Sequence, residues 1–166
     1  MALVQQRLPS KLDDPIAFAH RGAKAHAPEN TIEAFALALK LGVNGLESDV
    51  WTTSDGVVVM DHDGVVRQSL GRKTPISSLR RAQLPSHIPT LAEMIERCGT
   101  AYHLSLDLKD VESGQGVIDV VREMAPGLLE RVWLCAPAWE KLIPLRGQGA
   151  KLVDSTRDRK STRLNS

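Results

Sequence analysis

The sequence lacks a strong charge imbalance, a long apolar run and an abundance of cysteine. Its 166 residues carry 20 acidic and 21 basic side chains, a formal net charge of +1, which does not indicate a nucleic-acid or membrane-surface partner. No run approaches the ~18 apolar residues that a membrane span requires, so we expect no span. The first fourteen residues lack the continuous apolar stretch of a signal peptide. We therefore expect a cytoplasmic protein.

Several common catalytic signatures are also missing. The two cysteines, Cys98 and Cys135, are far apart in sequence, and two such residues without an export signal are more often buried thiols than a disulfide or a metal site. The sequence contains no Walker-type phosphate loop, dinucleotide-binding fingerprint, nucleophile elbow or paired Cys-x-x-Cys. Any chemistry must therefore rest on other side chains.

The spacing of apolar residues predicts an α/β fold. Strands are expected at 15–19, 43–53, 102–109, 131–135 and 151–154. Helices are expected at 32–39, 91–98, 117–124 and, as a short one, 139–145. The Asp55-Gly56 pair indicates a two-residue turn, after which 57–61 runs back along the second strand. Such alternation favours five parallel strands with crossover helices and one hairpin.

Helix starts are marked by capping residues. Asn30 or Thr31 is expected to cap the first helix, and Thr90 with Glu93 forms a capping-box pattern before another. Residues 67–89 are polar, and we expect them to be irregular, with at most a short helix.

Carboxylates on two strands are the candidate metal ligands. Glu47 and Asp49 stand two residues apart and so share a strand face. Asp107, on the polar face of a later strand, is the candidate third ligand, because parallel strands bring their C-terminal ends together. Carboxylates suit Mg²⁺ or Ca²⁺ better than Zn²⁺. Taken alone, a Glu-x-Asp pair is more typical of solvated acids.

Two histidines are the candidate acid and base. His20 ends the first strand, and a two-residue hairpin turn would place His62 directly opposite Asp49. Imidazole titrates near neutrality, so a pair can remove one proton and supply another, as cleavage of a phosphodiester requires. Asp61 and Asp63 flank His62, and either would orient its ring or cap the turn.

Two cations are candidate phosphate ligands. Arg21 has a planar guanidinium that can bind phosphate oxygens through two hydrogen bonds, and Lys109 supplies a point charge. Lys109 shares a strand face with Asp107 and would point into the same pocket.

These residues, in this order, resemble the glycerophosphodiester phosphodiesterase family. The matching motifs are His20-Arg21-Gly22, Pro28-Glu29-Asn30-Thr31 with Ala34-Phe35, Glu47-x-Asp49, Asp55-Gly56, His62-Asp63 and the strand from Leu104 to Lys109. The resemblance implies a TIM-type (β/α)8 barrel that hydrolyses glycerophosphodiesters to sn-glycerol 3-phosphate and an alcohol such as choline or ethanolamine. A small-molecule glycerophosphodiester is thus the expected partner.

The resemblance also implies roles for single residues. His20 and His62 would act as general acid and base, Glu47 and Asp49 would bind a divalent cation, and Arg21 and Lys109 would contact the phosphate. The family usually has a glutamate where this chain has Asp107. The shorter aspartate side chain affects how far the carboxylate reaches toward the ion and which metal ion the site prefers.

The length predicts an incomplete barrel. A (β/α)8 barrel typically needs ~250 residues, so about five of eight strands plus a hairpin are expected here. We expect an N-terminal extension at 1–14, a partial barrel domain at 15–157 and a disordered or non-native polar tail at 158–166. Two open sheet edges would favour aggregation. The alternatives are a phosphatidylinositol-type phospholipase-like enzyme and a non-catalytic truncated barrel fragment. The oligomeric state is left open.

Overall fold

The computed structural model describes residues 15–67, 71–110 and 112–155. These ranges contain every candidate site residue. The expected N-terminal extension and the expected polar tail lie outside these residues. Within the described ranges, no helix combines the length and the apolar character that crossing a bilayer would require.

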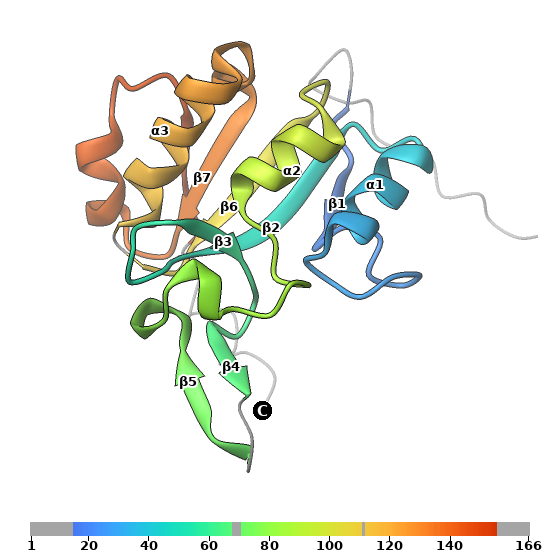
Figure 1. The fold of residues 1–166 in the computed structure, drawn as a ribbon. Coiled ribbons are helices and arrows are strands. Elements are labelled where there is room, and N and C mark those ends of the chain that lie inside the picture. The colour runs from blue at the N-terminus through green and yellow to red at the C-terminus, as the bar shows by residue number, and fades with distance from the viewer. Residues whose placement is uncertain (1–14, 68–70, 111, 156–166) are drawn as a thin grey trace, which may run out of the picture.

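Five parallel strands form the main sheet. They are β1 (Phe18–His20), β2 (Gly45–Thr52), β6 (His103–Leu108), β7 (Val132–Ala136) and β8 (Lys151–Asp154). The strands are hydrogen-bonded in the order β1-β2-β6-β7-β8, and every neighbouring pair is parallel (Figure 1). Successive parallel strands lie side by side in this way in a TIM-type barrel. The expected partial α/β barrel is therefore confirmed.

Helices cover one face of this sheet (Figure 1). They are α1 (Ile32–Lys40), α2 (Leu91–Cys98) and α3 (Ser113–Met124), followed by the 3₁₀ helices η4 (Pro126–Arg131) and η5 (Trp139–Leu145). The alternation in β6 sets the two faces: Leu104, Leu106 and Leu108 are buried in the core beneath the helices. Ser105 and Asp107 face the other side of the sheet, which is the inner, concave side in a TIM-type barrel, and the candidate site lies on that side.

The hairpin that follows β2 has a longer loop than the sequence predicts. β3 (Val58–Met60) pairs antiparallel with β2, and the loop residues are 54–56. Thr53 N–H donates to the Val57 carbonyl at 3.0 Å, and the Thr53 hydroxyl donates to Asp55 Oδ1 at 2.6 Å. Gly56 has φ of 80°, as the last residue of a three-residue hairpin loop requires. The predicted two-residue turn is therefore wrong.

The extra loop residue shifts the hairpin register by one. Val50 pairs with Met60, and the next pair brings the Asp61 N–H to the Asp49 carbonyl at 3.1 Å. Asp61, and not His62, thus lies across from Asp49. A shift of one residue moves every side chain to the other face of its strand. The prediction that His62 faces Asp49 directly is wrong for this reason.

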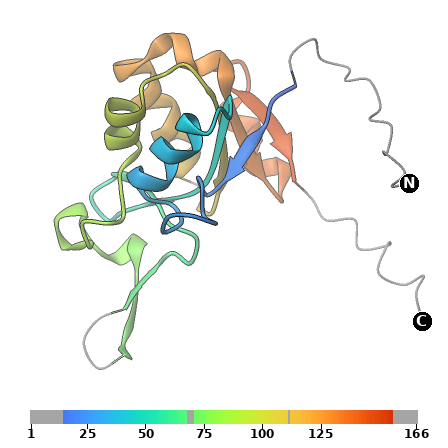
Figure 2. The ribbon, with the colours of Figure 1, turned by 90° about the vertical axis from the view of Figure 1, so that its right-hand side faces the viewer.

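The segment expected to be irregular contains a second, small sheet. β4 (Val65–Arg67) and β5 (Lys73–Pro75) pair antiparallel, and two short 3₁₀ helices follow, η2 (Ile76–Ser78) and η3 (Arg81–Gln83). Apolar residues within 65–88 form a second core cluster together with Val59 of β3: Val66, Ile76, Leu79, Leu84 and Ile88. In Figure 2 the β4–β5 hairpin extends away from the main sheet.

The predicted capping box starts α2. Thr90 Oγ1 accepts from Glu93 N–H at 3.0 Å, and Glu93 Oε2 accepts from Thr90 N–H at 2.7 Å. Arg81 Nη2 lies 3.4 Å from Glu93 Oε1. Burial alone would raise the pKa of Glu93, but these hydrogen bonds and the Arg81 charge outweigh burial and lower that pKa. At α1 the structure selects Thr31 as the cap, since its hydroxyl accepts from Ala34 N–H at 3.2 Å.

Replacing Glu93 with alanine should lower the free energy of unfolding by about 1 kcal/mol at pH 7, because the capping box is lost. A carboxylate whose pKa is lowered by folding stabilises above its unfolded-state value, here 4.5, and stops doing so as pH falls through the folded-state value. Urea titrations should therefore show that the difference in free energy of unfolding between wild type and Glu93→Ala becomes smaller below pH 4.5. Glu96→Ala, on the exposed side of α2, is the control. A gap independent of pH would contradict the capping role.

Candidate functional site

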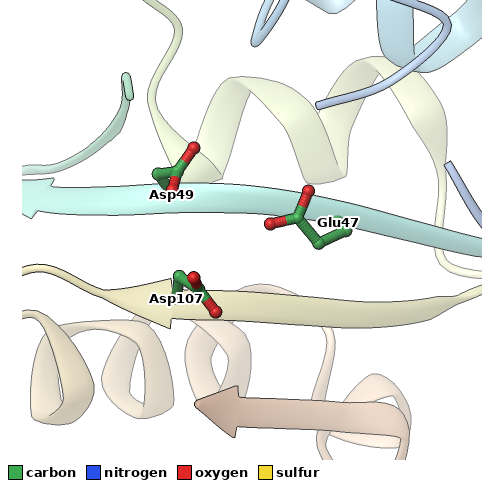
Figure 3. Close-up of side chains that lie close together, drawn as sticks. All are labelled: Glu47, Asp49 and Asp107. Atoms are coloured by element: carbon green, nitrogen blue, oxygen red, sulfur yellow. The ribbon is translucent and has the colours of Figure 1, made fainter. Parts of the chain in front are cut away.

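Three carboxylates from two neighbouring strands converge on the concave face. Glu47 and Asp49 come from β2 and Asp107 from β6, and the sheet register pairs Asp49 with Asp107 (Figure 3). One carboxylate oxygen from each residue lies within 4.8 Å of the others. Their side chains are 18%, 4% and 43% exposed, respectively. The structure thus brings together the three residues that the sequence proposes as metal ligands.

The chemistry of this cluster fits a hard divalent cation. All three groups offer carboxylate oxygens, the donors that Mg²⁺ and Ca²⁺ prefer. Burial, with further contributions from the Asp49 and Asp107 charges, raises the pKa of Glu47 to about 7, although a hydrogen bond from Arg21 N–H opposes the shift. An acid held so far above its ordinary range by burial and neighbouring acids marks a place where positive charge is favoured.

Both candidate phosphate ligands contact Asp49. Lys109 Nζ lies 2.7 Å from Asp49 Oδ1 and 3.6 Å from Asp107 Oδ2. Burial alone would lower the pKa of Lys109, but the two carboxylates raise it above its ordinary value. Arg21 Nε lies 3.4 Å from Asp49 Oδ2, and its Nη1 donates to Glu29 at 3.0 Å. Two fixed positive charges therefore border the carboxylate cluster.

His20 lies at the edge of the cluster, at the end of β1. Its Nε2 is 3.8 Å from Glu47 Oε2, because the sheet register pairs the two residues. Lys24 Nζ lies 2.8 Å from His20 Nδ1. Burial and the nearby Lys24 and Arg21 charges lower the pKa of His20. Its ring is 56% exposed and is therefore accessible to a ligand.

His62 lies one residue beyond the position opposite Asp49. Its Nδ1 is 2.9 Å from Asp63 Oδ1, and this contact lowers the pKa of Asp63. An ionised carboxylate only accepts hydrogen bonds, so the ring donates from Nδ1 and its Nε2 is left for another partner. The structure therefore selects Asp63, of the two flanking acids, to orient the ring. In the described part of the chain, no hydrogen bond or ion pair joins His62 to Glu47, Asp49 or Asp107.

The other flanking acid, Asp61, takes the turn-capping role. Its Oδ2 accepts the Gly64 N–H at 2.6 Å, and burial raises the pKa of Asp61. The backbone carbonyl of Asp61 accepts from Trp51 Nε1 at 2.9 Å. These bonds fix the loop that carries His62 against β2.

Gly22 allows the chain to turn sharply between His20 and α1. Its φ is 75°, and a Cβ at this position would lie 2.7 Å from the Ala34 carbonyl carbon and 2.8 Å from Ala34 Cβ. The Ala23 N–H donates to the Ala34 carbonyl at 2.9 Å, which holds the turn on the helix. Only glycine combines this backbone conformation with so close an approach.

Replacing Gly22 with alanine should lower the free energy of unfolding by about 3 kcal/mol, because it adds backbone strain and a clash with α1. Gly42→Ala is the matched control: Gly42 has φ of 91°, but a Cβ added there would meet nothing within 4 Å. The control should cost only the strain, about 1 kcal/mol. Urea denaturation of both variants measures the difference, and equal losses would argue against the clash.

The sequence missed one contributor to the site, Asn30. The sequence pattern indicates Asn30 as a possible helix cap, but Thr31 is the cap, and Asn30 Nδ2 instead lies 3.5 Å from Asp49 Oδ2. Asn30 is only 5% exposed and has φ of 56°. Asparagine is among the few non-glycine residues that adopt positive φ. A sequence cannot show which function that conformation serves.

Comparisons with known proteins agree on one family. A family model described as the glycerophosphoryl diester phosphodiesterase family matches residues 20–133. A glycerophosphodiester phosphodiesterase of Caldanaerobacter subterraneus is 29% identical over 131 residues, which cover 70% of this chain and 50% of that protein. Glycerophosphodiester phosphodiesterase 1 of Homo sapiens is 36% identical over 98 residues, covering 49% of this chain and 30% of that protein. The chain spans about half the length, or less, of such curated relatives.

Solved structures share the fold. A glycerophosphodiester phosphodiesterase from Thermotoga maritima superposes with a TM-score of 0.71 at 26% identity, over 84% of this chain and 61% of that chain. A phosphodiesterase from Oleispira antarctica, solved in complex with the product sn-glycerol-3-phosphate, gives a TM-score of 0.67 at 27% identity, over 78% of this chain and 60% of that chain. The described residues therefore correspond to part of a larger barrel in both structures.

Proposed function

The chain belongs to the glycerophosphoryl diester phosphodiesterase family, and on that basis we propose that it carries the phosphate-cleaving site of a glycerophosphodiester phosphodiesterase. The products would be sn-glycerol 3-phosphate and an alcohol such as choline or ethanolamine. The observation that carries the proposal is the convergence of Glu47, Asp49 and Asp107 beside His20. Active sites of TIM-type barrels lie at the C-terminal ends of the strands, where β1 and β6 deliver His20 and Asp107.

Glu47, Asp49 and Asp107 would hold a divalent cation, Mg²⁺ or Ca²⁺. Such an ion, when bound, would polarise the phosphoryl oxygens and offset charge that develops on them. The three carboxylates are within 4.8 Å of one another, which supports a shared ligand. The side chain of Asp107 is shorter than the glutamate usual in the family, and titrations with Mg²⁺ and with Ca²⁺ distinguish the two ions.

Arg21 and Lys109 would bind the phosphate of the substrate. Both side chains are more than two-thirds buried, at 17% and 27% exposed, and both are held by Asp49 on the concave face. Fixed cations of this kind stabilise charge without reorganising during the reaction. They would also orient the phosphodiester for attack by water or by the 2-hydroxyl of the glycerol.

His20 and His62 would share the proton transfers. One ring would remove the proton from the nucleophile, and the other would supply a proton to the leaving alkoxide. Two features support this: His20 reaches the carboxylate cluster through Glu47, and the contact with Asp63 leaves Nε2 of His62 to face a ligand. Substitution of each ring with alanine, followed by measurement of kcat, tests its role.

The proposed function predicts cation-dependent release of glycerol 3-phosphate. The purified chain would be incubated with glycerophosphocholine and Mg²⁺ or Ca²⁺, and with EDTA in parallel. Equal amounts of glycerol 3-phosphate and choline, formed only with a cation, would support the proposal. Phosphatidylinositol serves as a second substrate, because release of inositol phosphate would favour the phospholipase alternative. A chain that melts cooperatively but cleaves neither substrate would contradict the proposal and favour a non-catalytic fragment.

A further inference from the structure

Asn30 combines an unusual backbone conformation with burial. Among the residues that the structure describes, Arg21 and Asn30 are the two non-glycine residues with positive φ, both at 56°. They are joined directly, because the Asn30 N–H donates to the Arg21 carbonyl at 3.1 Å. Strained conformations persist where the surroundings impose them, and they concentrate at functional sites. Here both strained residues contact the same carboxylate, Asp49.

The side-chain amide of Asn30 is oriented by hydrogen bonds with Ser48 and Asp49. Ser48 Oγ donates to Asn30 Oδ1 at 2.8 Å, and Asn30 Nδ2 donates to Asp49 Oδ2 at 3.5 Å. Ser48 is fully buried, and Asp49 is 3% exposed. A buried hydroxyl on one side and a carboxylate on the other leave one orientation of the amide that satisfies both. The N–H donor therefore faces the carboxylate.

The contacts of Asp49 divide between its two oxygens. Oδ2 accepts a hydrogen bond from Asn30 Nδ2 and lies 3.4 Å from Arg21 Nε, which is an ion-pair contact only, while Oδ1 lies 2.7 Å from Lys109 Nζ. Arg21 and Lys109 are the proposed phosphate ligands and would be shared with substrate. Asn30 is a neutral donor that binds Asp49 without competing for phosphate.

We propose that Asn30 is a positioning residue that, fixed by Ser48, orients the Asp49 carboxylate toward Glu47 and Asp107 for cation binding. The inference rests on the proposed cation site. Asn30 acts through Asp49 and does not touch the ion. It also joins two parts of the site, because its backbone holds the loop that carries Arg21 and its side chain holds β2. Partners that orient metal ligands typically change metal affinity 10- to 100-fold when they are removed.

The substitution Asn30→Gly tests the side chain without adding backbone strain, because glycine adopts positive φ freely. Binding of Mn²⁺ would be measured without substrate, from the electron paramagnetic resonance signal of the free ion. We expect the dissociation constant of Asn30→Gly to rise at least tenfold. Ser48→Ala should raise it less. Adding Ser48→Ala to Asn30→Gly should not raise the dissociation constant further, because Ser48 acts through the Asn30 amide, which this variant already lacks.

Asn44→Gly is the matched control for a purely structural loss. Asn44 Oδ1 accepts from Ala17 N–H at 2.8 Å, and its Nδ2 donates to the Pro15 carbonyl at 3.1 Å, at the opposite end of the strands. This variant should lower the melting temperature and leave the Mn²⁺ dissociation constant within about twofold. If Asn30→Gly also lowered the melting temperature but left the Mn²⁺ dissociation constant within about twofold, the role inferred for Asn30 would be overturned and the proposed cation site would stand. A wild-type chain without saturable Mn²⁺ binding would overturn both the proposed cation site and this inference.

Discussion

Replacing His20 or His62 with alanine should lower kcat for glycerophosphocholine hydrolysis by about 10²- to 10⁴-fold, the usual contribution of a general acid or base. Each imidazole is proposed to transfer one of the two protons, so the loss of either imidazole slows the reaction. Steady-state release of glycerol 3-phosphate measures the effect. Both rings are partly exposed, 56% for His20 and 42% for His62, so neither substitution should remove much packing.

His87→Ala is the control for this prediction. His87 is an exposed histidine in the loop before α2 and has no role in the proposed reaction. Its removal should leave kcat within about twofold. Thermal melts of all three variants should agree within a few degrees, because surface substitutions rarely change stability by more than about 0.5 kcal/mol. If His62→Ala retained the wild-type kcat, the proposed role of His62 as general acid or base would be contradicted.

The hairpin shows why the placement of His62 cannot be obtained from sequence alone. The Asp55-Gly56 pair correctly indicates a turn, but the loop length depends on Thr53, whose hydroxyl both donates to Asp55 and accepts the Val57 N–H at 2.9 Å. A single extra residue changes the pairing of every later position. The sequence therefore predicts the hairpin but not its register.

The parallel strands are easier to predict because their pattern is long and periodic. β6 alternates apolar and polar residues over its whole length, so the common face of Asp107 and Lys109 follows from the sequence. β4 and β5 have three residues each and their sequences carry no such pattern. Their pairing depends on a small apolar cluster around Ile76, which only the tertiary structure assembles.

Asn30 illustrates a different limit. Its neighbour Thr31 has the same local signature of a helix cap, and both assignments fit the sequence. The hydroxyl of Thr31 takes the cap, which leaves the Asn30 amide to bridge Ser48 and Asp49. Those partners are eighteen and nineteen residues away in sequence. The role of a buried polar side chain is set by such distant partners.

Replacing Asp49 with asparagine should remove the proposed cation binding and also destabilise the fold. Asp49 is the most buried of the three carboxylates, and both Arg21 and Lys109 form ion pairs with it. Removing one partner of a fully buried ion pair costs about 3 to 5 kcal/mol. Because Arg21 and Lys109 are 17% and 27% exposed, water can partly solvate them, and we expect a loss of about 2 to 3 kcal/mol.

Asp107→Asn separates the two effects, because the side chain of Asp107 is 43% exposed. This variant should weaken Mn²⁺ binding at least tenfold, since one of the three proposed charged ligands is lost, yet change the free energy of unfolding by less than about 1 kcal/mol. Urea titrations and Mn²⁺ titrations of both variants measure the two quantities. Asp119→Asn, on the exposed face of α3, should change neither. Equal stability losses in Asp49→Asn and Asp107→Asn would contradict the prediction that burial makes the loss of the Asp49 charge more costly.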